Sequence, residues 1–207
     1  MKIAVLGANG RSGRIFIEAA LAAGHSVRAG VYHANTLQAH EALEIIQCDA
    51  TNEGDIKQLV EGQDAIVSLI GHVKDSAPTV QTDAIRVVVR VLEQAAYPRR
   101  LVSLTGTGVR VPGDRITLVD RVLNTGVSFI DPQRVSDGIE HAKVLQNSSL
   151  AWTIVRVLKL QGLQHRTFTL QAHGPTLPFV SRSMVAKAIL KVLEEDSFVK
   201  QLPILSR

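Results

Sequence analysis

Short apolar runs alternate with longer amphipathic segments along the chain. The apolar runs are four to seven residues long and rich in Val, Ile and Leu, which predicts buried β-strands. Apolar positions spaced three or four residues apart predict helices between them. The predicted strands cover residues 2–6, 26–32, 44–48, 65–70, 101–105, 152–157 and 202–205. The predicted helices cover residues 11–23, 53–61, 78–96, 134–146 and 183–194.

Residues with strong preferences for helix ends support several of these boundaries. Asn52 can cap the second predicted helix, with Asp55 three residues further on, and Ser181 can cap the last one. Gly24 and Gly62 follow the first two helices, where glycine commonly ends a helix. The pattern therefore marks where the helices begin and end as well as where they lie.

Strands that alternate with helices of 10 to 15 residues predict right-handed βαβ units. We therefore expect an α/β protein with a doubly wound, mostly parallel sheet, a Rossmann fold, formed by residues 1–207 as a single domain. Ligands bind beyond the carboxyl ends of the strands in such sheets. The segments 106–135 and 158–180 are long and poor in regular pattern, so we expect them to be loops on the substrate side.

Composition excludes several other classes of protein. The 207 residues include one cysteine, Cys48, so neither a disulfide framework nor a multi-cysteine zinc site is possible within the chain. No apolar run approaches the roughly 20 residues of a membrane span, and the chain start does not resemble a signal peptide. The net charge of +4 is dispersed rather than gathered in a patch. We expect a cytoplasmic protein that binds small anionic ligands, and neither nucleic acid nor membrane.

The most informative motif is the glycine-rich segment Gly7-Ala8-Asn9-Gly10-Arg11-Ser12-Gly13. It follows the first predicted strand and leads directly into the first predicted helix, which is the context of a dinucleotide-binding turn. Gly7 permits the sharp turn, Gly10 lets the backbone approach a phosphate, and Gly13 allows close packing of helix and strand. The pyrophosphate would then lie at the positive end of the helix.

The segments 7–13, 48–51 (Cys-Asp-Ala-Thr) and 65–71, together with 153–156 (Thr-Ile-Val-Arg), resemble the atypical short-chain dehydrogenases. Within that group the chain is most similar to the NmrA-like and flavin reductase (biliverdin reductase B) branch. In the group as a whole a proline usually follows the Thr-Ile-Val-Arg motif, whereas Val157 follows it here. The resemblance implies a Rossmann fold and NAD(P) binding at Gly7, Asn9, Gly10, Arg11, Ser12, Gly13, His33, Asp49, Ala50, Ile70, Gly71, Thr105 and Lys143.

The choice of dinucleotide depends on the segment 31–36, which follows the second predicted strand. NAD-binding sites usually carry an acidic residue here to hold the ribose 2′-hydroxyl, and this segment has none. Arg11 can reach the adenosine ribose, and His33 and Asn35 can add hydrogen-bond donors, so we expect NADP, with NAD as the alternative. The resemblance also implies that Asp49 accepts a hydrogen bond from the adenine amino group, although it could equally cap a helix.

Typical short-chain dehydrogenases use a Tyr-x-x-x-Lys pair on a helix, in which the tyrosine is the acid. Here Lys143 lies on the corresponding helix, but Ile139 occupies the tyrosine position. Lys143 could still contact the nicotinamide ribose. Thr105 and Thr107 stand where the family has its serine. Lys159 follows residues 152–157, where the similar reductases carry a histidine near the substrate. Lys143, Thr105, Thr107 and Lys159 are therefore the candidate catalytic residues. No histidine spacing predicts a metal site.

Two functions of different kinds remain open from the sequence. The first is an NAD(P)H-dependent reductase that transfers a hydride to a small planar redox acceptor, such as a flavin or quinone. The second is a non-catalytic NAD(P) sensor that binds a protein partner, as NmrA-like proteins do. Epimerase or dehydratase chemistry is less well supported, because it depends on the tyrosine.

Overall fold

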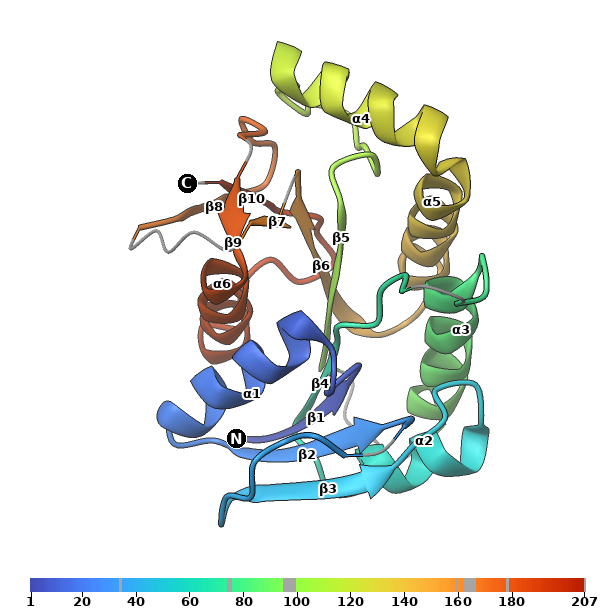
Figure 1. Ribbon diagram of the computed structural model, residues 1–207, viewed down its shortest axis with the longest axis vertical. Coiled ribbons are helices and arrows are strands. Elements are labelled where there is room, and N and C mark those ends of the chain that lie inside the picture. Colours follow the sequence, from blue (N-terminus) through green and yellow to red (C-terminus); the bar gives the residue numbers. More distant parts are fainter. Residues whose placement is uncertain are drawn as a thin grey trace.

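The computed structural model describes residues 1–33, 35–73, 76–94, 100–158, 160–161, 167–177 and 179–206. Figure 1 shows a twisted sheet with helices on both of its faces. The strands are β1 (Lys2–Leu6), β2 (Ser26–Val31), β3 (Leu43–Gln47), β4 (Ala65–Ser68), β5 (Arg100–Gly106), β6 (Ala151–Val157), β7 (Leu160–Gln161), β8 (Thr169–Gln171), β9 (Val180–Ser181) and β10 (Ile204–Ser206). The helices are α1 (Arg11–Ala22), α2 (Glu53–Val60), α3 (Val80–Leu92), α4 (Leu118–Ile130), α5 (Pro132–Gln146) and α6 (Arg182–Glu194).

The main sheet has the strand order β3-β2-β1-β4-β5-β6-β10-β8. The pairs from β3 to β10 are parallel, and β8 pairs antiparallel with β10 at the edge. The order of the first six strands is that of a doubly wound Rossmann sheet, as the sequence predicted. Its topological switch point lies between β1 and β4, so the crevice beyond the carboxyl ends of these two strands is the expected ligand site.

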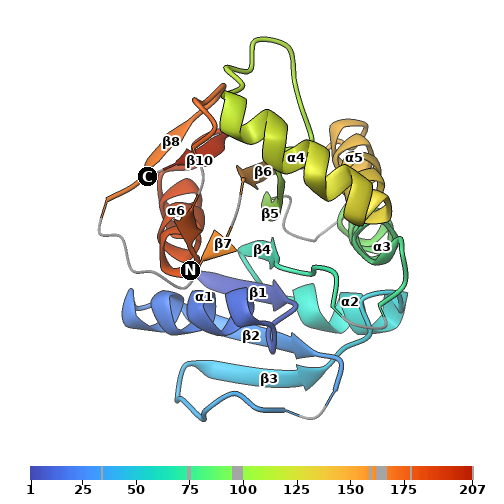
Figure 2. The same ribbon diagram turned by 45° about the horizontal axis from the view of Figure 1, so that its top comes forward.

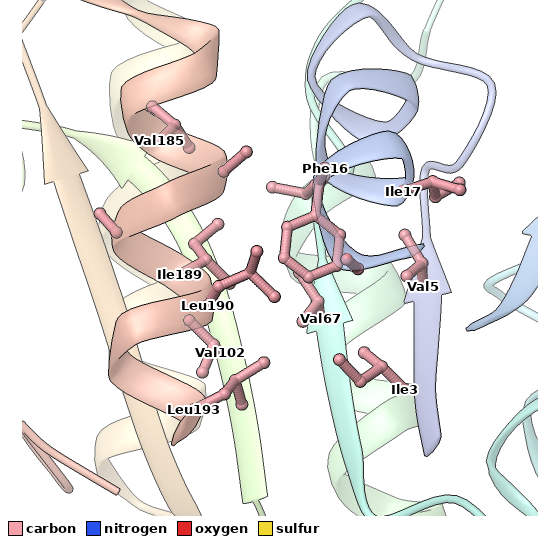
Figure 3. Packing of buried hydrophobic residues seen from close by; sticks show 14 of the residues in the cluster. Ile3, Val5, Phe16, Ile17, Val67, Val102, Val185, Ile189, Leu190 and Leu193 are labelled. Atoms are coloured by element: carbon pink, nitrogen blue, oxygen red, sulfur yellow. The ribbon is translucent and has the colours of Figure 1, made fainter. Parts of the chain in front are cut away.

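Two apolar layers hold the helices against the sheet. On one face, α1 and α6 pack over side chains of β1, β4 and β5; Figure 3 shows the ring of Phe16 from α1 directed toward Ile189 and Leu190 of α6. On the other face, α2, α3 and α5 cover Ala4 and Leu6 of the same strand β1. Alternate residues of β1 thus face opposite layers, as expected for a strand buried on both sides.

The structure departs from the predicted elements at several points. The segment 106–135, expected to be a loop, contains the 13-residue helix α4, whose N-cap Thr117 accepts a hydrogen bond from the backbone N–H of Asp120. Its apolar residues recur at intervals of three and four, a helical spacing that the expected loop overlooked, and most of their side chains face outward. The strands β7 and β9 have only two residues each, which is too short for a periodic signal. The predicted end of the third helix, at residue 96, lies outside the described residues.

The helix α4 lies away from both helical layers. Figures 1 and 2 show it crossing beyond the carboxyl ends of β5 and β6, close to the start of α5. It therefore stands on the side of the sheet where a ligand would bind. Within the described ranges, no helix has the length and apolar character needed to cross a membrane.

Candidate functional site

The glycine-rich turn lies at the switch point between β1 and β4. Gly7 has a φ angle of +74°, and a Cβ atom there would lie 2.8 Å from the carbonyl carbon of Leu69, directly after β4. A Cβ atom on Gly13 would lie 2.2 Å from the Gly7 oxygen and 2.6 Å from the Ala8 oxygen. Only glycine at these two positions lets the turn sit this close to both α1 and β4.

The amino end of α1 is open to an anion. Its N-cap is Gly10, and no hydrogen bond from a side chain caps this end of the helix in the part of the chain described. The first backbone N–H groups of a helix have no partner within the helix, and the helix dipole adds positive potential there. Gly10 is exposed, and its Cβ position meets only the Gly7 oxygen, at 3.0 Å. A side chain at Gly10 would therefore be tightly placed, whereas the backbone N–H groups at this end of the helix are accessible.

The residues beside the end of β2 form a small polar network. Asn9 Oδ1 accepts hydrogen bonds from the backbone N–H and the hydroxyl of Thr36, at 3.4 and 3.1 Å. Arg14 donates from Nε to the Asn9 carbonyl at 3.0 Å and from Nη2 to Thr36 Oγ1. The arginine in contact with this segment is therefore Arg14, whereas the sequence drew attention to Arg11. Burial, together with repulsion from Arg11, lowers the pKa of Arg182 at the start of α6, so Arg11 lies within electrostatic range of that helix.

The other residues assigned to the adenosine side flank the ends of β2 and β3. His33 is exposed and contacts the ring of Tyr32 edge to face, with 4.6 Å between ring centroids. Asp49 Oδ1 accepts from the N–H and the hydroxyl of Thr51, at 2.8 and 2.7 Å, and Ala50 lies half-buried beside it. The helix cap is instead Asn52, so Asp49 shapes the turn that precedes α2.

The single cysteine, Cys48, lies beside this region. Cys48 is buried, and burial raises the pKa of its thiol to about 12, with the charges of Asp55 and Asp49 adding to the effect. A thiol with so high a pKa is not a nucleophile at neutral pH.

A buried carboxylate joins the ends of α3 and α5. Asp137 accepts hydrogen bonds from His72 Nε2 and from the backbone N–H groups of Gln81 and Thr82, each at 2.9 Å. The two N–H groups belong to the first turn of α3, so a side chain of α5 caps α3 from outside the helix. The Gln81 side chain donates to the Ile70 carbonyl at 2.8 Å, and Gly71 is exposed next to it. This network fixes the segment after β4.

The candidate threonines lie at the carboxyl end of β5. Thr105 is buried, and a Cβ atom on Gly138 of α5 would lie 2.9 Å from its hydroxyl oxygen. Thr107 is also buried, and its hydroxyl accepts a hydrogen bond from Asn124 of α4 at 3.0 Å. The Asn124 amide also donates to the buried carboxylate of Asp120, at 2.7 Å. The α5 residue that faces Thr105 is therefore a glycine.

The role predicted for Lys143, contact with the nicotinamide ribose, stays a prediction. Its amine donates to Glu140 Oε1 at 2.6 Å, and 58% of the side chain is exposed. The helix α5 runs antiparallel to β5, and Gly138 is the residue that faces the carboxyl end of the strand. Lys143 lies five residues after Gly138 on the same helix. Lys159, the fourth candidate, lies outside the described residues.

A buried ion pair anchors the loop after β5. Arg156, the last residue of the Thr-Ile-Val-Arg motif, donates to both carboxylate oxygens of Asp114, at 2.5 and 2.8 Å. It also donates to the carbonyls of Val109 and Leu202. Burial alone would raise the pKa of Asp114, but the hydrogen bonds from Arg156 and from the Val111 N–H lower it. The motif arginine thus holds the segment that leads from Thr107 to α4.

A second buried group is His141 of α5, whose Nε2 lies 2.9 Å from the Ser103 hydroxyl. Burial lowers its pKa from 6.5 to about 4, against the opposing effects of the Gln81 backbone and of Asp137. The unfolded chain therefore binds a proton at higher pH than the folded chain does. The stabilising effect is complete above pH 6.5 and is lost as the pH falls toward 4.

We expect this histidine alone to lower the free energy of unfolding by about 3 kcal/mol between pH 6.5 and 4. Urea unfolding at a series of pH values measures the loss, and His141→Gln removes most of it. The exposed His40 provides the control: His40→Gln leaves the pH dependence unchanged. A wild-type slope retained in His141→Gln would contradict this assignment. The contribution of Asp114 is separate, since its lowered pKa affects stability only below about pH 4.

The strand order and the glycine turn at the switch point define a Rossmann-type α/β protein. Residues 7–196 match the model of a family described as NAD(P)H-binding, and the chain belongs to this family.

Solved structures with the same fold cover all of this chain. One is a candidate NADH-flavin reductase from Streptococcus pneumoniae, with a TM-score of 0.79, 22% identity and 99% of that chain covered. A second is a short-chain dehydrogenase/reductase from Veillonella parvula in complex with NADP, with a TM-score of 0.79, 19% identity and 94% covered. A third is the oxidoreductase ylbE from Lactococcus lactis, with a TM-score of 0.82, 17% identity and 91% covered.

Several contacts around the site carried no readable signal in the sequence. Asp137 is 55 residues from Thr82, and Arg156 is 42 residues from Asp114, so neither pair shows a local pattern. Arg14 could have been singled out, because it directly follows the third glycine on the first turn of α1. The sequence placed the turn correctly but not the groups that surround it.

Proposed function

We propose that this protein is an NAD(P)H-dependent reductase that transfers a hydride to a small planar redox acceptor, such as a flavin or quinone. The dinucleotide would bind with its pyrophosphate at the amino end of α1 and its nicotinamide toward the carboxyl ends of β4 and β5. The cofactor supplies the hydride chemistry, and the chain binds it and orients it.

One observation carries the choice of acceptor. Ile139 stands at the tyrosine position of a short-chain dehydrogenase, its neighbour Gly138 faces Thr105, and the hydroxyls of Thr105 and Thr107 are among the polar groups at this end of β5. Reduction of an isolated carbonyl develops an alkoxide, which needs a positioned proton donor or oxyanion partner. A conjugated ring spreads the added charge, so orientation against the nicotinamide supplies much of the rate. The two threonine hydroxyls then serve to position the ring.

The acceptor range tests this proposal. The loss of NADPH absorbance measures its oxidation. We expect oxidation with flavins and quinones, and a rate at least about 100-fold lower with simple ketones and aldehydes. If a carbonyl compound is the best substrate, the proposal is wrong. If the dinucleotide binds tightly while every acceptor is inert, the chain is a sensor of the NAD(P) pool rather than a reductase.

We further propose that the preferred dinucleotide is NADPH. The segment 31–36 after β2 has no acidic residue to repel a 2′-phosphate. The guanidinium of Arg14 lies against this segment through Thr36, and so supplies positive charge near the place of the adenosine ribose. A phosphate held by arginine forms strong, charge-assisted hydrogen bonds.

NADPH is therefore expected to raise the melting temperature more than NADH does at equal concentration. At 100 times its Kd, a ligand adds about 2.7 kcal/mol, or roughly 5–10 °C for a chain of this size. Arg14→Met is expected to weaken NADPH binding about tenfold and to leave NADH binding nearly unchanged. A larger thermal shift with NADH than with NADPH would refute the preference.

A further inference from the structure

We propose that the outer face of α4 is the contact surface of a homodimer. This face consists of Leu118, Val119, Val122, Gly126, Phe129 and Ile130. The exposed fractions of Leu118, Val122, Phe129 and Ile130 are 77%, 64%, 84% and 87%. Ten large apolar residues are exposed in the described part of the chain, and six of them belong to this one helix of 13 residues. Single exposed apolar residues are ordinary, whereas a contiguous group marks a contact surface.

Internal hydrogen bonds fix which side of α4 faces outward. Asp120 and Asn124, one turn apart, point to the body of the protein, where Asp120 pairs with Arg110 at 3.2 Å and Asn124 bonds Thr107. Asp120 is fully buried, and the helix start is held by Thr117 Oγ1, which donates to the Thr176 carbonyl at 2.7 Å. The apolar side chains cannot turn inward without breaking these bonds, so their exposure is built into the fold.

The shape of the outer face suits a second helix. Leu118, Val122, Gly126 and Ile130 follow one another at intervals of four residues and form a ridge along α4. Gly126 leaves a gap in the middle of this ridge, since a Cβ atom there would meet no other atom within 4 Å. Two copies of such a ridge can cross closely at the glycine, with the larger side chains of each copy packed beside the other helix.

The apolar area exposed on α4 is large enough for the binding partner to be a second copy of the same chain. The exposed apolar side chains of α4 amount to roughly 700 Å² per chain, which is more than the largest apolar patch of a typical monomer. Two such faces together bury on the order of 1,400 Å², within the range of specific protein dimers. A twofold axis buries the same surface on both subunits, and apolar interfaces without charged residues are typical of permanent homodimers.

A membrane surface fits this helix less well. Helices that lie on membranes carry several basic residues on their polar face. In α4 the only basic residue is Arg121, and the polar face is occupied by hydrogen bonds within the protein. Figures 1 and 2 show no other helix or strand on the far side of α4, so the face is open to a partner.

Dimer formation would also hold the segment after β5 in place. The inner face of α4 contacts Thr107 and Arg110, so a partner on its outer face would press α4 onto the carboxyl end of β5. The dimer is expected to form without the dinucleotide, because none of its contact residues belongs to the glycine turn.

Sedimentation equilibrium of the full chain tests this proposal. We expect a mass twice the 22.4 kDa of one chain across about 1–100 μM protein. Phe129→Glu is expected to give a monomer with unchanged far-ultraviolet circular dichroism and unchanged NADPH affinity. The neighbouring Ser128→Glu adds the same charge at an exposed position on another side of the helix and is expected to remain a dimer.

A wild-type protein that is monomeric throughout this range would overturn the proposal. A Phe129→Glu variant that stays dimeric would also overturn it, because the dimer would then use another surface. Binding of the wild type to vesicles of phosphatidylcholine and phosphatidylserine, with no dimer in solution, would assign the face to a membrane and likewise reject the homodimer.

Discussion

Replacement of Gly10 by leucine is expected to weaken NADPH binding at least about 100-fold and to leave the protein folded. Gly10 is exposed, and its backbone angles (φ −67°, ψ 160°) are open to any residue, so a side chain needs only a small shift of the Gly7 oxygen, 3.0 Å from its Cβ position. That side chain would extend over the amino end of α1, where the pyrophosphate is proposed to lie. Isothermal titration calorimetry gives the affinity, and circular dichroism gives the state of the fold.

A control variant distinguishes an effect at the glycine turn from a general effect of adding leucine to α1. Glu18 is exposed on the same helix, two turns further along, so Glu18→Leu adds the same side chain away from the turn. It should bind NADPH like the wild type, and Gly10→Ala should fall between the two. Equal affinity in Gly10→Leu and the wild type would place the dinucleotide elsewhere.

Loss of the Asp114 carboxylate is expected to destabilise the fold by about 3–5 kcal/mol. Asp114→Ala leaves the buried guanidinium of Arg156 without its counter-ion, and in the wild type both side chains are at most 3% exposed. For a chain of this size the melting temperature should fall by about 10 °C or more. Thermal unfolding followed by circular dichroism measures this change.

The control is an ion pair of the same kind on the surface. Lys191 and Glu195 lie 3.8 Å apart, and each is 55% exposed. Glu195→Ala should change the free energy of unfolding by less than about 1 kcal/mol, because water and salt screen exposed pairs. If the two variants have equal stabilities, Arg156 does not depend on Asp114 and the loop after β5 is held in another way.

The main sheet could be predicted from the sequence because its signals are local. The strand β1 is a continuous apolar run, and Asn52 and Ser181 cap α2 and α6 as predicted. The helix α4 has the same kind of signal, since its apolar residues recur at intervals of three and four, so the sequence could have shown it as a helix. What the sequence does not show is that these apolar side chains face outward, while the buried Asp120 and the half-buried Asn124 face the protein.

The candidate site was predictable only in part, because some of its contacts are local in the sequence and others are not. The glycine turn has a fixed spacing because backbone strain at Gly7 and close packing at Gly13 act over a few residues. The ion pair of Lys143 with Glu140 depends on how α5 packs in the fold, which the spacing of the motif does not specify. The close approach of Gly138 to Thr105 likewise joins residues 33 positions apart, so no local pattern predicts it.

Hydride transfer itself is the most direct test of the proposed reductase. The rate of flavin or quinone reduction is measured without oxygen, using NADPH that carries deuterium at C4 of the nicotinamide. We predict rapid oxidation that is slower with the deuterated cofactor than with ordinary NADPH, and that is lost in Gly10→Leu. An oxidation rate equal to that of a protein-free solution, in protein saturated with NADPH, would contradict the account.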